Sequence, residues 1–193
     1  MSGRPREFKN TEVIDAAMDV FWKNGFEASS AQKLCEQTGL GRGSLYNAFG
    51  SKHALFEASL KRYQEIGIQE QIKILEQPGP IKGRLRILME WAIEFDLKGP
   101  ERRGCFTVNS AVELGGKDPG VAALVDHHIK NLEQALCHVM ALGQRSGEIK
   151  SKRPALELAR LFLSSYYGLR VLNKVVQDRN LLLDVVEGTL AAL

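Results

Sequence analysis

Two short helices separated by three residues constrain this chain more than any other feature of its sequence. The stretch SSAQKLCEQTGLGRGSLYNAF, residues 29–49, predicts a helix that stops at Gly39, a break over Gly39–Gly41 and a second helix that ends at Phe49. Apolar residues recur at helical spacing on one side of each helix, while the second helix keeps a polar outer side. Helices this short bury too little surface to be stable alone, so they must rest on neighbouring helices.

Helical patterns flank this stretch on both sides. Residues 11–24 carry an apolar stripe, and a longer helix begins at Lys52 and ends before the Pro-Gly-Pro of residues 78–80. Beyond that punctuation the spacing predicts helices at about 81–97, 105–114, 119–146, 154–176 and 180–192. The sequence pattern contains no convincing strand or internal repeat, so we predict an all-α fold.

Two helices joined by a three-residue turn that contains glycine are typical of the helix-turn-helix unit, whose second helix enters the major groove of DNA. Gly39 provides the backbone freedom that the turn needs. Leu34, Cys35, Leu45 and Phe49 are expected to face the core, which leaves the polar residues of the second helix outside. Cys35 is therefore not expected to act as a sensor.

Residues 11–60 resemble the DNA-binding domain of the TetR family of transcriptional regulators. The resemblance is carried by VIDAAMDVFWKNGFEASS and LCEQTGLGRGSLYNAFGSKHAL, together with their order and spacing. It implies an N-terminal arm and helix-turn-helix domain over residues 1–52 and a helical effector-binding and dimerisation domain over residues 53–193. It also implies a homodimer, most simply a repressor, that a small-molecule effector releases from a palindromic double-stranded DNA operator.

The resemblance also assigns DNA contacts to the second helix and to the start of the next one. Arginine can bond a guanine edge with two hydrogen bonds, and serine, tyrosine and lysine suit phosphate oxygens. Ser29 or Ser30, at a helix N-terminus, could offer backbone N–H groups to a phosphate, and Arg4 and Arg6 could form an arm in the minor groove. The remaining predicted DNA-binding residues are Arg42, Gly43, Ser44, Tyr46, Asn47 and Lys52.

The C-terminal sequence LLLDVVEGTLAAL is apolar around most of a helix, so we expect it to pair with a second copy of the chain. The preceding helix adds an apolar surface that is predicted to join this interface. That surface consists of Leu156, Phe162, Leu163, Tyr166 and Leu169.

An effector pocket is expected between the DNA-binding domain and this interface, because apolar walls with a few polar groups suit small ligands. Cys105 follows Arg102, Arg103 and Gly104 at a predicted helix start, where cationic neighbours and the helix dipole favour a reactive thiolate. Cys105 is thus a candidate sensor of electrophiles, with a small buried core residue as the alternative. The other candidate pocket residues are Trp91, Phe95, Phe106, Asn109, His127 and Tyr166.

Composition limits the other classes of function. An apolar fraction of 44% with 25% charged residues indicates a folded protein, and the absence of a long apolar window or signal peptide predicts a cytoplasmic location. The net charge of +3 is compatible with a polyanionic partner. Three cysteines without CxxC spacing and histidines without ligand spacing predict no metal and no cofactor.

Two alternatives remain open from the sequence. One is a helical enzyme with Cys105 as nucleophile and His127 or His138 as base, although nothing in the sequence orients such a pair. The other is a helical ligand-binding or interaction protein that does not bind DNA. Salt-dependent binding to duplex DNA would separate a regulator from the second alternative.

Overall fold

The computed structural model describes residues 10–96, 102–176 and 178–193, and these residues form nine helices and no strand. The predicted all-α class is confirmed, and the predicted helix ends agree with the observed ones within two residues. The helices are α1 (Asn10–Asn24), α2 (Ala31–Thr38), α3 (Arg42–Phe49), α4 (Lys52–Leu75), α5 (Ile81–Asp96), α6 (Phe106–Leu114), α7 (Pro119–Ser146), α8 (Ala155–Val175) and α9 (Arg179–Ala191).

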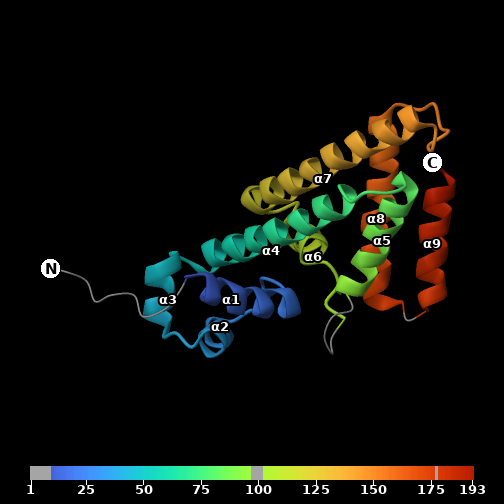
Figure 1. Cartoon of the computed structure of the whole chain (residues 1–193). Helices are drawn as coiled ribbons and strands as arrows, with labels where there is room; N and C mark the ends of the chain where they lie inside the picture. Colours follow the sequence, from blue (N-terminus) through green and yellow to red (C-terminus); the bar gives the residue numbers. More distant parts are fainter. Residues whose placement is uncertain (1–9, 97–101, 177) are drawn as a thin grey trace.

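Local signals set the ends of the short helices. The Ser30 hydroxyl accepts a hydrogen bond from the Lys33 N–H at 3.2 Å and so caps the start of α2. Gly39 ends α2 with a left-handed φ of 69°, a conformation that favours glycine. Ser51 then caps α4 by accepting from the Ala54 N–H at 3.0 Å. In the fold, α2 lies against α1, and α3 stands beside the start of α4 (Figure 1).

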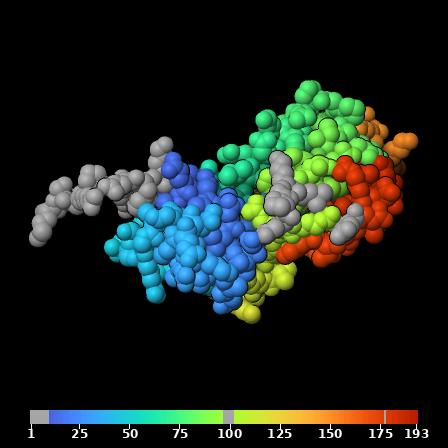
Figure 2. All heavy atoms as spheres, turned by 90° about the horizontal axis from the view of Figure 1, so that it is seen from below, coloured from blue at the N-terminus to red at the C-terminus, as the bar shows by residue number. Residues whose placement is uncertain are grey.

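Helix α4 connects the two ends of the molecule. It begins beside α3 and runs to the α5 end, and α7 lies along it in the same direction (Figure 1). Helices α1–α3, which we call the N-terminal lobe, form one end, while α8 and α9 lie at the other (Figure 2). The α4 helix therefore gives the lobe a continuous connection to the rest of the chain.

Two apolar cores are arranged along α4. The first joins the N-terminal lobe and the first half of α4 to α6 and the start of α7, with Phe21, Phe56 and Phe106 among its buried residues. The second joins the end of α4 to α5, α7, α8 and α9. Because the first core crosses residue 52, the predicted division at residues 52 and 53 runs through shared packing.

Helix α8 packs differently from the sequence prediction. Phe162, Leu163, Tyr166 and Leu169 were expected on a dimer surface, yet all four are buried in the chain's own second core, and only Leu156 of that set is exposed. The reason is that α5, α7 and α9 cover this side of α8. Its opposite side exposes a different row with spacings of three and four residues, namely Leu161, Ser164, Gly168, Val171 and Val175.

Within the described residues, no helix combines the length and the apolar character that a membrane crossing requires.

The two adjacent histidines of α7 have opposite environments. His127, a candidate pocket residue, has an exposed side chain that hydrogen-bonds Asn131, so it lies on the outer side of α7. His128 faces the core instead and is 4% exposed. Burial, followed by the positive charges of Arg170 and His127, lowers the pKa of His128 from 6.5 to about 4.

The low pKa of His128 makes stability depend on pH. The unfolded chain takes up a proton near pH 6.5 and the folded chain only near pH 4, so acidification through this window favours unfolding. Urea denaturation should show that protonation of His128 lowers the free energy of unfolding by about 2 kcal/mol between about pH 7.5 and pH 5. His128→Gln should remove this component, whereas the exposed His127→Gln should retain it. Equal pH dependence in both variants would contradict the assignment.

Candidate nucleic-acid interface and regulatory junction

Helix α3 presents a polar surface to solvent. Arg42, Gly43, Ser44 and Asn47 are exposed, and Tyr46 is half-buried against the first core. Leu45, on the inner side, is fully buried and fixes which side of α3 faces outward. The arrangement matches what a helix in a major groove requires, a fixed apolar side and a free polar side.

The two serines before α2 differ. Ser29 is fully buried: its hydroxyl donates to the Gly25 carbonyl at 2.6 Å and its N–H donates to the Phe26 carbonyl at 3.3 Å. It therefore stabilises the turn between α1 and α2 and does not face a phosphate. Ser30 is exposed at the α2 N-terminus, as expected. Arg4 and Arg6 lie outside the described residues.

Lys52 joins α4 to the same turn. Its Nζ donates to the carbonyl oxygens of Phe26 at 2.9 Å and Ser29 at 3.0 Å, and it lies 4.3 Å from the centre of the Phe26 ring. These two carbonyls leave one of the three ammonium N–H donors for the predicted phosphate contact. The sequence could not indicate this, because 23 residues separate Lys52 from Ser29.

Helix α6 holds the end of α1. The Glu113 carboxylate accepts from the backbone N–H groups of Phe26 and Glu27, both at 3.0 Å. Gly25 has a φ of 78°, and a Cβ there would lie 2.7 Å from a Glu113 oxygen. Only glycine therefore satisfies both the turn and the contact with α6.

The segment before α6 adds a second attachment between α1 and α8. Trp22 Nε1 donates to the Gly104 carbonyl at 2.8 Å, and Arg103 pairs with Asp19 at 2.8 Å while stacking 4.1 Å above the Trp22 ring. Arg102 donates to the Val176 carbonyl beyond α8. These contacts and Glu113 form what we call the regulatory junction.

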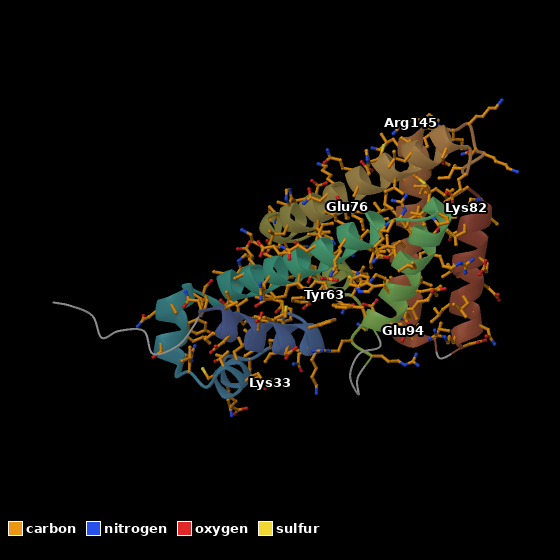
Figure 3. All side chains as sticks on the ribbon, viewed as in Figure 1. Lys33, Tyr63, Glu76, Lys82, Glu94 and Arg145 are labelled. Carbon is orange, nitrogen blue, oxygen red and sulfur yellow. The ribbon has the colours of Figure 1, made fainter. Side chains whose placement is uncertain are left out.

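A buried polar network lies behind this junction. The Arg170 guanidinium binds both oxygens of Asp96, at 2.9 and 2.5 Å, and donates to the Tyr63 hydroxyl at 3.1 Å. Both charged side chains are almost fully buried, at 2% and 1% exposure. Tyr63 lies on the side of α4 that faces α1 and α6 (Figure 3). The network thus links α4, α5 and α8.

Burial and charge shape the ionisation of these groups. Burial raises the pKa of Asp96, and the hydrogen bonds and charge of Arg170 oppose the rise. Burial alone would lower the pKa of Arg170, but Cys105, Tyr63 and Tyr166 reverse this and keep it well above its ordinary value. Burial also raises the pKa of Tyr63 well above its ordinary value. The charge of Arg170 opposes this rise, and the neighbouring Cys105 adds to it. The arginine therefore stays protonated beside the cysteine.

The predicted pocket residues fall into separate places. Cys105 caps α6 at its N-terminus, as expected, but is 1% exposed. Trp91 stacks on Phe95 with ring centres 4.9 Å apart, and the Tyr166 hydroxyl accepts from Gln71 at 2.9 Å. Phe106 packs edge-on to Tyr63, whereas Asn109 contacts Arg103 and Lys174 on the other side of α6. Phe95 and Phe106 thus pack around the Tyr63 ring in the interior, and Tyr166 lies beneath the Arg170 guanidinium.

The sequence analysis missed Tyr63, Asp96 and Arg170 as site residues. A detectable signal was present, because Asp96 and Arg170 each interrupt an otherwise apolar helical face. A charge on such a face must find a partner on folding, although the sequence does not say which one.

The arrangement needed for a cysteine-dependent enzyme is not formed. Cys105 is buried, whereas His127 and His138 are both exposed on α7. A different group, His53, Glu57 and Asp118, brings three possible ligand atoms within 4.8 Å of one another. Here Nε2 of His53 contacts Asp118, Nδ1 lies 3.7 Å from Glu57, and Asp118 caps α7 through Gly120 and Val121. This group already acts as a contact between α4 and α7.

Comparisons with known proteins agree with this geometry. The family model described as bacterial regulatory proteins of the tetR family matches residues 13–59, and that described as the tetracyclin repressor-like C-terminal domain matches residues 82–187. A similar protein is YezE of Bacillus subtilis (strain 168), an uncharacterized HTH-type transcriptional regulator. It is 33% identical over 193 residues, which cover 99% of each chain. The transcriptional repressor ComR of Escherichia coli (strain K12) is 29% identical over 74% of this chain and 70% of its own.

Solved structures share the arrangement of helices. A cysteine mutant of the TetR family regulator CifR, complexed with 26-bp double-strand operator DNA, superposes with a TM-score of 0.86. It is 28% identical, and the match covers 98% of this chain and 99% of that one. The reduced form of E. coli NemR has the same fold, with a TM-score of 0.84 at 17% identity over 93% of each chain. With both domain models and a full-length relative in agreement, the chain belongs to the TetR family of DNA-binding transcriptional regulators.

Proposed function

We propose that this protein is a homodimeric repressor that leaves a palindromic operator when a small molecule binds or when Cys105 is modified. The observation that carries the DNA-binding role is the exposed polar side of α3, held in place by the buried Leu45. CifR, at 28% identity, is complexed with operator DNA, and ComR is a repressor by name. Action on a chromosomal operator places the protein in the cytoplasm.

The proposed base-reading residue is Arg42, whose exposed guanidinium opens α3. Ser44, Tyr46 and Asn47 are proposed to anchor phosphates or bases, and Ser30 to present the α2 N-terminus to the backbone. Arg4 and Arg6 keep their proposed place in the minor groove. Residues 1–52 would then form the DNA-binding domain and residues 53–193 the regulatory domain.

The proposed dimer interface is the exposed row on α8. Leu161, Ser164, Gly168, Val171 and Val175 follow the spacing at which two helices interdigitate. Three of them are large apolar residues with 45%, 50% and 73% exposure, which a partner would cover. A two-fold dimer formed here would carry two α3 helices that read half-sites about 34–36 Å apart, or a multiple of that distance.

Release is proposed to pass through the regulatory junction and α4. Glu113 holds the α1–α2 turn from α6, and α4 joins the N-terminal lobe to the second core. An effector or an adduct that favours another position of α6 would change the separation of the two α3 helices. Cys105 is suited to this because it begins α6 and lies beside the permanent charge of Arg170.

We expect Arg42→Ala to weaken operator binding by about 5- to 150-fold, because a bidentate base contact contributes roughly 1–3 kcal/mol. Lys130→Ala, which removes an exposed lysine from α7, is the matched control and should bind normally. Electrophoretic mobility shifts with a sequence selected from random DNA would measure both. Unchanged binding by Arg42→Ala would remove it as the base reader.

A substitution of Lys52 distinguishes two roles of this lysine, which are to stabilise the turn before α2 and to contact a phosphate. Lys52→Met loses two hydrogen bonds to carbonyls, so we expect a loss of about 1–3 kcal/mol in unfolding free energy. The slope of log affinity against log salt should stay the same. A smaller slope for Lys52→Met would show that Lys52 contacts a phosphate.

The α8 row predicts a dimer in solution. Light scattering should give twice the chain mass of 21.5 kDa, and Leu161→Glu should give the single-chain mass because it buries a carboxylate in the interface. Val112→Glu, on an 84% exposed residue of α6, should remain a dimer. A dimeric Leu161→Glu protein with unchanged dissociation would place the interface elsewhere.

The role of Cys105 is tested by alkylation. We expect N-ethylmaleimide to reduce operator affinity of the unchanged protein, since an adduct cannot fit at a 1% exposed position without moving α6. Cys105→Ser should become insensitive, while Cys35→Ser and Cys137→Ser should respond as before. If Cys105→Ser loses affinity on treatment like the unchanged protein, modification of Cys105 is not the signal.

A further inference from the structure

A groove separates α1 of the N-terminal lobe from α6 and α8. Its volume of about 410 Å³ lies within the range of roughly 300–1,000 Å³ that is common for small-molecule sites. In the space-filling view, α6 meets the lobe along this boundary (Figure 2). The residues on which the proposal rests are Trp22, Ser110, Val112, Glu113 and Lys174, all of which line the groove.

Apolar side chains form most of the wall. The Trp22 ring lies inside, near Phe106 at a centre distance of 6.5 Å. Val112 stands at the mouth with 84% of its surface exposed. An apolar body seated in the groove would remove this side chain from water, which favours binding.

The charge of the lining is positive. Lys23, Lys174 and Arg170 contribute three cations, and Glu113 is the anion among the lining residues. Asp96 neutralises Arg170 from behind, and two backbone N–H groups already stabilise the Glu113 carboxylate. The ammonium group of Lys174 therefore adds a positive charge to the groove, which favours an anion.

An unsatisfied donor faces the same space. The Ser110 side chain is 1% exposed, and its hydroxyl has no hydrogen-bond partner among the described residues. Buried hydroxyls are normally paired, and an unpaired one costs free energy until an acceptor arrives. A carboxylate oxygen in the groove would accept from Ser110 while lying near the ammonium of Lys174.

We propose that this groove binds an organic anion with an apolar body, such as an aryl carboxylate, and that binding weakens the hold of α6 on α1. The Glu113 contacts to Phe26 and Glu27 form the rim of the groove, so a ligand placed there acts directly on the regulatory junction. This inference rests on the proposed function as an effector-released DNA-binding protein, for which it names the chemical class of effector and its place of binding.

Binding is tested with phenylbutyrate against uncharged phenylbutanol, using Trp22 fluorescence with Trp91→Phe as the background. Val112 allows a matched pair of variants, because its 84% exposure tolerates either charge. Val112→Lys should tighten phenylbutyrate binding and Val112→Glu should weaken it, each by about fivefold, and phenylbutanol should show neither effect. Ser110→Ala and Lys174→Met should also weaken phenylbutyrate binding. Unchanged phenylbutyrate affinity in all four variants would overturn the proposal.

Operator binding is measured separately, first without ligand. Saturating phenylbutyrate should lower the operator affinity of the unchanged protein, and a larger concentration should be needed for Val112→Glu. Unchanged operator affinity at saturation would overturn the link between groove and junction. A protein that binds no operator even without ligand would instead refute the proposed DNA-binding function, so the two failures are distinguishable.

Discussion

The buried pair of Arg170 and Asp96 is the interaction on which the regulatory half of the structure depends. It draws α8 to α5, and its additional bond to Tyr63 extends the contact to α4. A charge buried this deeply is tolerated only with its partner, and removal of one member typically costs about 3–5 kcal/mol. The three helices are therefore held in one relative position near the start of α6.

The regulatory junction connects the helices around this buried pair to the N-terminal lobe. Trp22, Glu113 and Arg103 reach between segments far apart in sequence, and each contact ends on α1 or its following turn. Lys52 fastens the same turn from α4. The turn is thus held from two sides, by α6 through Glu113 and by α4 through Lys52.

The sequence predicted most of the architecture because local signals decide it. Ser30, Gly39 and Ser51 cap or end helices through neighbouring residues, and the apolar spacing of α3 identifies Leu45 as its inner side. Long-range partners were not predictable. The roles of Lys52 and Ser29 depend on carbonyl groups that only tertiary packing brings near. Which of the adjacent His127 and His128 is buried depends on how α7 is rotated about its axis, and the sequence does not fix that rotation to within one residue.

The shallow burial of α3 has a consequence for the energetics of recognition. Leu45 is its one fully buried residue in a helix of eight, so α3 has less apolar surface holding it than any of the long helices. Such a segment opens at low free-energy cost, and its amide hydrogens should exchange early. Part of the free energy of DNA association is then used to order α3. Substitutions that stiffen this helix without touching DNA would therefore raise affinity for all sequences alike and leave the discrimination between them unchanged.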